Sequence, residues 1–260
     1  MVEKIEEIVR EASRLMLTDH FRVDSKGGSE NLVTSSDYAV QEFLCSKLSE
    51  LVPGSSFLCE EEGMQDYGDH EYVWIIDPID GTMNYTRGIR ECAISVALKK
   101  DGELFAAVVY SPAAGEMFTA EKGKGARYNG NTIHVSDRKF RDALFCTAWS
   151  TYRKEWAPVC MDIINDVYYR INDIRRFGVA SLELCYLACG RCELYFEYRL
   201  QPWDIAAGSL ILQEAGGILR TLHGKPLTYK CPELVIGANS EENFAELAST
   251  IDRYIEKTAY

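Results

Sequence analysis

The chain has 260 residues and a formal net charge of −12 at pH 7, with 47% hydrophobic and 26% charged residues. This length is enough for one large or two small hydrophobic cores without disulfides or structural metals. The excess of acidic residues argues against a nucleic-acid partner or an anionic membrane surface, since either needs a basic patch. No apolar run reaches the ~20 residues that cross a bilayer, and charges alternate over residues 1–10. We therefore expect a cytoplasmic protein with no membrane partner.

The nine cysteines are an odd number and lie mostly in apolar segments, which is typical of reduced thiols. Cys189-Gly190-Arg191-Cys192 has C-x-x-C spacing at the end of an apolar helical pattern. A thioredoxin-type motif would instead begin a helix, where the helix dipole lowers the thiol pKa, and no second pair completes a zinc site. We therefore favour packing of small residues at a helix end over a redox or zinc role.

The first half of the chain predicts two helices followed by consecutive strands. Apolar residues at helical spacing predict amphipathic helices over about residues 1–22 and from 37 to 53, with a loop at 25–29 and a short strand beginning at residue 31. Strands are predicted at 56–59, 73–76, 92–98, 104–110, 116–119 and 126–128. The last four read as an antiparallel meander, with a hairpin turn at Asn129-Gly130.

After residues 136–141 the pattern changes to alternating strands and helices. Strands are predicted at 144–148, 174–177, 194–197 and 234–238, and helices at 158–169, 181–188, 202–215 and 241–255. We expect two parts: an N-terminal α+β part over 1–138 with the antiparallel sheet, and a C-terminal α/β part over 139–260.

The most informative stretch runs from Trp74 to Tyr85, where an apolar strand meets two carboxylates, a glycine and a hydroxyl. We expect Pro78 to end the strand, so that Asp77 and Asp80 converge across a turn. Gly81 and Thr82 would then begin a helix whose N–H groups face an anion. Two carboxylates repel a phosphate unless cations lie between them, which indicates a divalent-metal phosphate site. An Asx-type turn after a strand end is the alternative.

Two further carboxylates at element ends complete a candidate two-metal site. Glu61 follows the strand at 56–59, and Asp204 lies in the first turn of the helix that begins near 202. Hard oxygen ligands select Mg²⁺, and Asp77 could bridge two ions. Thr82 backed by Asp37 could orient the attacking water.

These residues carry a family resemblance. Asp77-Pro78-Ile79-Asp80-Gly81-Thr82, Pro202-Trp203-Asp204 and Glu214-Ala215-Gly216-Gly217, in this order and spacing, resemble the inositol monophosphatase family, as do residues 32–37 and 123–126. The match covers nearly the whole chain. It implies a layered α-β-α-β-α sandwich of the sugar-phosphatase type, within the α+β or α/β class, that commonly assembles as a homodimer.

The resemblance also implies a ligand set for two or three Mg²⁺ ions. One ion would be bound by Glu61, Asp77 and the backbone carbonyl of Ile79, and a second by Asp77, Asp80 and Asp204. The first ligand could be any of the three acids at 60–62, and we choose Glu61 as the second of the family's Glu-Glu pair. Most of these ligands thus fall in the N-terminal part, and the C-terminal part completes the site.

The same resemblance implies roles for the remaining site residues. Thr82 and Asp37 match the pair that activates water, so that they and Glu61 make up the catalytic group. Five residues would contact the substrate: Lys26 from a mobile loop, Gly81 and Thr82 at the phosphate, and Ala180 and Glu197 at the inositol hydroxyls.

We expect Mg²⁺-dependent hydrolysis of a small phosphate monoester, with myo-inositol monophosphate the preferred substrate. Glu197 favours a polyol because a carboxylate accepts hydrogen bonds from vicinal hydroxyls. Fructose-1,6-bisphosphatase or 3'(2'),5'-bisphosphate nucleotidase activity is the alternative, because Arg90-Glu91 and Arg175-Arg176 depart from the family pattern and an arginine could favour a second phosphate. A non-catalytic binding subunit is the remaining alternative.

Overall fold

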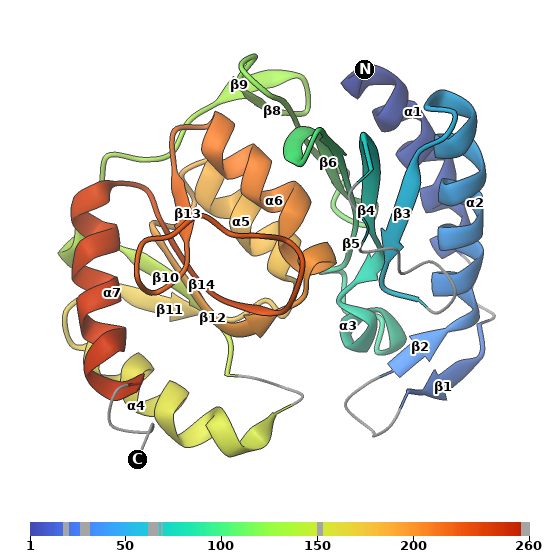
Figure 1. Cartoon of the computed structure of the whole chain (residues 1–260). Coiled ribbons are helices and arrows are strands. Elements are labelled where there is room, and N and C mark those ends of the chain that lie inside the picture. Colours follow the sequence, from blue (N-terminus) through green and yellow to red (C-terminus); the bar gives the residue numbers. More distant parts are fainter. Residues whose placement is uncertain (18–20, 27–31, 62–67, 69, 150–152, 256–260) are drawn as a thin grey trace.

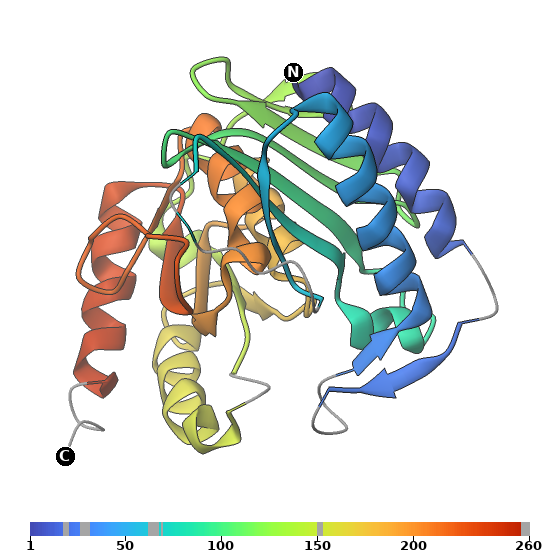
Figure 2. The ribbon, with the colours of Figure 1, turned by 45° about the vertical axis from the view of Figure 1, so that its right-hand side comes forward.

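The computed structural model describes residues 1–17, 21–26, 32–61, 68, 70–149 and 153–255. Two sheets carry the fold, one of seven strands in the order β3-β4-β5-β6-β7-β8-β9 and one of five in the order β11-β10-β12-β14-β13. Helices α1 and α2 cover one face of the larger sheet, α5 and α6 lie between the sheets, and α4 and α7 cover the far face of the smaller sheet (Figures 1 and 2). The predicted layered α-β-α-β-α sandwich is therefore confirmed.

The larger sheet is a meander with one parallel strand added at its edge. Its strands are β3 (Ser56–Cys59), β4 (Tyr72–Asp80), β5 (Ala93–Lys100), β6 (Glu103–Ser111), β7 (Glu116–Glu121), β8 (Ala126–Tyr128) and β9 (Asn131–Ile133). β3 runs parallel to β4 and the other neighbours are antiparallel. The predicted hairpin turn is confirmed, with positive φ at Asn129 and Gly130 (46° and 82°). β9 was not predicted.

The prediction that Pro78 ends its strand is wrong, because β4 continues to Asp80. The pairing with β5 shifts instead: Asp77 pairs with Ser95 and Asp80 with Ala93, so that β4 carries one extra residue. A bulge of this kind accepts a proline, because the residue at the bulge need not donate to the ladder. The chain turns only at Gly81.

The N-terminal helices differ from prediction in where they begin and end. α1 (Val2–Ala12) ends in a 3-10 turn at Ser13–Met16, well before the predicted end near residue 22. α2 (Ser35–Leu51) begins with a capping box between Thr34 and Asp37. A two-stranded ribbon of β1 (Val23–Ser25) and β2 (Leu32–Thr34) precedes it. Residues 27–29 of the predicted loop and residue 31 lie outside the described residues.

The smaller sheet contains β10 (Leu144–Thr147), β11 (Asp173–Arg175), β12 (Leu194–Leu200), β13 (Ile218–Arg220) and β14 (Glu233–Ala238). Its helices are α4 (Ala157–Tyr168), α5 (Ala180–Ala188), α6 (Pro202–Glu214) and α7 (Glu241–Ile255). β13 was not predicted. The change of sheet falls near the predicted boundary, but one hydrophobic cluster includes Ala107 from β6 and Leu210 from α6. The division into two domains stays a prediction.

Helix α6 lies between the two sheets and carries one of the predicted site residues. Ten of its residues are buried, and it packs on β4, β5, β6 and β7 as well as on α5. Gly208 permits the close approach of α5, because a Cβ there would lie 2.8 Å from Leu184. Among the described residues, no helix combines the length and the apolar character needed to cross a membrane.

Candidate metal and phosphate site

Carboxylates from four elements meet where β4 ends. Asp77 and Asp80 come from β4, Glu61 from the residues after β3, Asp204 from the first turn of α6 and Asp37 from the first turn of α2. Asp77 and Asp80 are 2% and 9% exposed, and Asp37 and Glu61 are fully buried. Burial raises the pKa of Asp77 well above its ordinary value, and the charges of Glu60, Asp80 and Asp204 raise it further. Asp77, Asp80 and Asp204 therefore lie within electrostatic reach of one another.

Backbone N–H groups orient three of these carboxylates. Asp77 Oδ1 accepts the N–H of Ile79 (3.0 Å). Asp204 Oδ2 accepts the N–H of Gln201 (2.7 Å) in the capping box of α6. Asp80 Oδ2 accepts the N–H of Ser181 at the start of α5 (2.8 Å). Each carboxylate is thus held by rigid backbone.

The acids after β3 contact the predicted lysine. Lys26 Nζ lies 2.6 Å from Glu61 Oε1 and 3.1 Å from Glu60 Oε1. Glu61 Oε2 is buried and has no hydrogen-bond partner in the part of the chain that the structure describes. Burial, together with the charge of Glu60, raises the pKa of Glu61 to about 7 although Lys26 opposes the shift.

Glu60 was passed over in the sequence, yet its charge acts on more of the cluster than that of Glu61. Burial raises the pKa of Asp204 and of Asp80, to about 6 for Asp80, and Glu60 contributes to the shift at both as it does at Asp77. In the sequence, a run of three acids carries no signal that tells which of the side chains points toward the cluster. Glu62, the third, lies outside the described residues.

The donor set suits a hard divalent cation. Within the described ranges, no three His, Cys, Asp or Glu side chains stand in a ready-made coordination shell. The cluster nevertheless buries several carboxylates, of which Glu61 contacts Lys26, and Glu61 Oε2 has no hydrogen-bond partner among the described residues. Buried carboxylate oxygens whose negative charge is not compensated fit Mg²⁺ and would not suit a soft metal.

Thr82 and Asp37, predicted as a pair, are in contact. Thr82 Oγ1 lies 3.3 Å from Asp37 Oδ1 and 3.1 Å from the carbonyl oxygen of Ile79. Thr34 holds the other oxygen of Asp37 through its N–H (2.8 Å) and its hydroxyl (2.5 Å). Burial raises the pKa of Asp37 to about 6. When Thr82 donates its proton to Asp37, the lone pairs of its hydroxyl can accept a hydrogen bond from water.

Gly81 begins the short helix α3 (Thr82–Thr86) in a conformation that requires glycine. Its φ is 89°, and a Cβ there would lie 2.8 Å from Val179 Cγ2 and 3.1 Å from the carbonyl oxygen of Glu91. The start of α5, with the predicted substrate contact Ala180, therefore packs directly on the Gly81 turn.

Glu197 lies on β12 with its charge acting on the same cluster. Tyr195 donates its hydroxyl hydrogen to Glu197 Oε2 (2.9 Å). Burial and the charge of Asp80 raise the pKa of Glu197 to about 7, and Arg176 opposes this shift. The guanidinium of Arg176 lies 4.7 Å from the centre of the Trp149 ring. The predicted polyol contact thus has Asp80 and Arg176 as charged neighbours.

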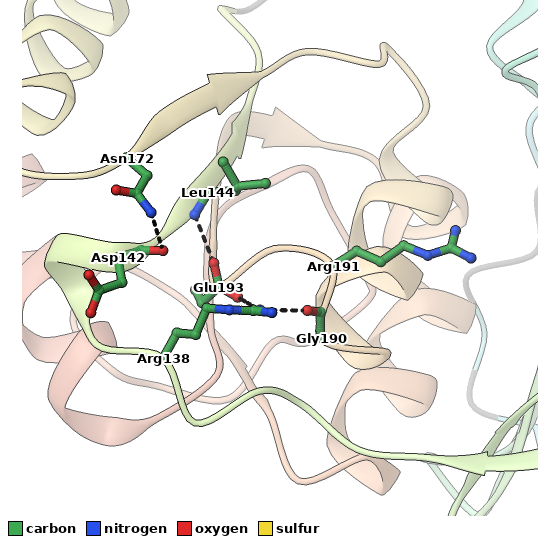
Figure 3. A pocket seen from close by; sticks show the side chains of 7 residues that line it. All are labelled: Arg138, Asp142, Leu144, Asn172, Gly190, Arg191 and Glu193. Atoms are coloured by element: carbon green, nitrogen blue, oxygen red, sulfur yellow. Dashed lines mark hydrogen bonds and ion pairs between the residues drawn. The ribbon is translucent and has the colours of Figure 1, made fainter.

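The hollow drawn in Figure 3 lies elsewhere. It has a volume of about 770 Å³ and is lined by Arg138, Asp142, Leu144, Asn172, Gly190, Arg191 and Glu193, none of which is a predicted site residue. Gly190 and Arg191 are the middle of the C-x-x-C motif, which follows the end of α5 as predicted. Cys189 and Cys192 are free thiols, and Cys192 is 2% exposed. The hollow therefore shares no lining residue with the carboxylate cluster.

Comparisons with known proteins place the chain in a family. A model of the inositol monophosphatase family matches residues 1–256. A Vibrio cholerae protein named Nus factor SuhB is 38% identical over 198 residues, which cover 76% of this chain and 74% of that protein. Extragenic suppressor protein suhB from Bartonella henselae superposes with a TM-score of 0.89 at 31% identity, over 96% of this chain and 98% of that one.

A third relative has been solved with ligands. SaIMPase-II of Staphylococcus aureus, in a structure bound to inositol monophosphate, has a TM-score of 0.82 at 26% identity and covers 100% of this chain and 99% of that one. The same protein bound to 2'AMP has a TM-score of 0.81 at 28% identity, with 99% and 96% covered.

Proposed function

Since the chain belongs to the inositol monophosphatase family, we propose that it is an Mg²⁺-dependent phosphatase that hydrolyses a small phosphate monoester, preferably myo-inositol monophosphate. The observation that carries the proposal is the buried carboxylate cluster around Asp77, whose mutual repulsion bound cations would relieve. No covalent intermediate with the protein is needed, because the cluster suits direct attack by water.

The proposed ligands for two or three ions are Asp77, Asp80, Asp204, Glu61 and the carbonyl oxygen of Ile79. Glu60 joins this set, because its charge acts on all three aspartates. When bound, Mg²⁺ neutralises phosphate charge and acidifies a water. Lys26, which contacts both glutamates, would add a positive charge at the phosphate.

In this proposal Thr82 and Asp37 orient the attacking water. Asp37 accepts a hydrogen bond from Thr82 Oγ1, so the lone pairs of the hydroxyl oxygen would accept a hydrogen bond from the water and fix its direction. Backbone N–H groups of Gly81 and Thr82 would bind the phosphate oxygens.

The substrate preference rests on Glu197, with Ala180 as its neighbour in the proposed polyol contact. A carboxylate accepts hydrogen bonds from adjacent hydroxyls, and Arg176 helps to keep it ionised. The staphylococcal relative is named with inositol monophosphate and with 2'AMP as ligands, so a nucleoside monophosphate is the second candidate.

The test is release of phosphate from a panel of esters at saturating Mg²⁺. We expect the highest kcat/KM with inositol monophosphate. Equal or higher efficiency with 2'AMP, fructose-1,6-bisphosphate or 3'-phosphoadenosine 5'-phosphate would refute the inositol preference. No release from any ester would refute the phosphatase itself.

A non-catalytic role is the alternative to phosphatase activity, because a relative is named Nus factor SuhB. That name gives no support to the expected absence of a nucleic-acid partner. If the chain acts only as a binding subunit, Asp80→Asn will leave its binding partners unchanged and no phosphatase activity will be found in the wild type. Assembly as a homodimer and a cytoplasmic location stay predictions.

A further inference from the structure

Glu183 is a buried glutamate that the proposed mechanism leaves unused. It lies in the first turn of α5, and its side chain is 1% exposed. Its Oε1 accepts the N–H groups of Phe177 (2.7 Å) and Gly178 (3.0 Å). Its Oε2 has no hydrogen-bond partner among the described residues. Because a buried carboxylate with an unpaired oxygen lowers stability, stability alone does not account for a glutamate at this position.

The turn that Glu183 holds is bonded to the proposed site at both ends. On one side Asn84, in α3, donates its side-chain N–H to the carbonyl oxygen of Phe177 (2.8 Å). On the other side the N–H of Ser181 donates to Asp80 Oδ2 (2.8 Å). Residues 177–181 therefore connect Glu183 to a proposed metal ligand.

The same turn packs on the proposed phosphate-binding residue. A Cβ on Gly81 would lie 2.8 Å from Val179 Cγ2 and 3.5 Å from the carbonyl oxygen of Gly178. A shift of the turn by a fraction of an ångström would change this contact, since the fit leaves no space.

We propose that Glu183 is a positioning residue that, through residues 177–181, fixes Asp80 for metal binding and holds the turn against Gly81. Without the carboxylate, two N–H groups lose their acceptor and the start of α5 is released from Asp80. This inference rests on the proposed function. Residues that orient metal ligands are worth roughly 10- to 100-fold in metal affinity or activity.

The experiment compares Mg²⁺ affinity, measured by calorimetry, with thermal stability and with kcat and KM. Glu183→Ala is expected to weaken Mg²⁺ binding by roughly 10- to 100-fold and to lower kcat. Glu183→Gln keeps an acceptor oxygen of the same reach and is expected to restore Mg²⁺ affinity to near the wild-type value.

Glu193→Ala is the matched control. Glu193 is also 1% exposed and accepts the backbone N–H of Leu144 (2.7 Å), but it lines the hollow of Figure 3, whose lining includes none of the proposed site residues. We expect this variant to lose stability without a change in Mg²⁺ affinity. If Glu183→Ala does not fold, Glu183→Asp, which withdraws the carboxylate by one methylene, serves in its place.

The inference is overturned if the folded Glu183 variant binds Mg²⁺ as tightly as the wild type, or if Glu193→Ala weakens binding equally. A wild type that binds Mg²⁺ but releases phosphate from no ester refutes the proposed function instead. In that case the difference in Mg²⁺ affinity still decides the role of Glu183.

Discussion

The backbone N–H of Ser181 lies 2.8 Å from Oδ2 of Asp80, and this hydrogen bond joins residues 101 positions apart in the chain. It ties the first turn of α5, which lies against the smaller sheet, to the last residue of β4 in the larger sheet. The proposed metal site is thus built across the contact between the two sheets, so its integrity can be measured through metal binding as well as through activity.

Asp80→Asn should reduce the stabilisation of the protein by Mg²⁺, because it removes a proposed ligand of the second ion. An ion that binds only the folded state adds about 2.7 kcal/mol at a concentration of 100 times its Kd, and the amide supplies no charge to hold it. Urea unfolding with and without Mg²⁺ measures the difference. In EDTA we expect the variant to be at least as stable as the wild type, because one of several repelling buried charges is gone.

Asp162→Asn is the control for that experiment, because Asp162 is an exposed aspartate on α4. It should keep the full Mg²⁺ effect. A stabilisation by Mg²⁺ that is as large in Asp80→Asn as in the wild type would show that Asp80 binds no ion.

Thr82→Val should lower kcat by roughly 10²- to 10⁴-fold with little change in Mg²⁺ affinity. Valine has a similar shape but has no hydroxyl to donate to Asp37 or to accept a hydrogen bond from a water. Thr82→Ser keeps the hydroxyl and should retain most of the activity. Steady-state phosphate release gives the answer, and equal activity of Thr82→Val and the wild type would remove Thr82 from the mechanism.

Gly81→Ala should destabilise the protein more than Gly88→Ala. Both glycines have positive φ, 89° and 68°, so either alanine costs about 1–2 kcal/mol of backbone strain. Only at Gly81 would the new Cβ also clash, since it lies 2.8 Å from Val179, whereas a Cβ on Gly88 meets no described atom within 4 Å. Chemical unfolding measures the loss in the free energy of unfolding for both variants. Equal losses would show that the contact with Val179 does not restrict the residue at position 81.

The metal-free protein should become less stable as the pH rises between about 5 and 8. Burial raises the pKa of Asp37 to about 6, of Glu61 to about 7 and of Glu183 to about 8, from ordinary values of 3.8 and 4.5. In this window the folded state holds protons that the unfolded state has already released. Raising the pH removes them from the folded state and takes away that stabilisation.

Urea unfolding in EDTA across this window tests the pH prediction. Glu183→Gln removes one of the titrating groups and should make the decline shallower. A stability that stays constant or increases with pH would contradict the burial of ionisable carboxyl groups in the cluster.

Much of the fold could be predicted because each half of the chain carries strong periodic patterns. The motif from Asp77 to Thr82 follows a fully apolar strand, and this placed its carboxylates at the strand end. The bulge at Pro78 could not be predicted, since it depends on pairing with β5. The three-residue strands β9 and β13 were missed because such short runs carry no periodic signal.

The site could be predicted where a residue type was chemically unusual for its position. Glu61 was chosen over Glu60 in the sequence because, in a run of three acids, only tertiary contacts decide which side chain faces the cluster. Glu183 was missed for a different reason. It reads as a single polar residue between Leu182 and Leu184, and its burial follows from the packing of α5 on α6.

Helix α6 brings its carboxylate to the site from between the two sheets, and this has a consequence for synthesis of the protein on the ribosome. Asp77 and Asp80 emerge more than a hundred residues before Asp204. A nascent chain therefore carries an incomplete set of the proposed ligands until α6 has emerged and both sheets have docked around it. If Mg²⁺ binds this set as proposed, it would favour finished molecules over partly folded ones and act as a late folding ligand.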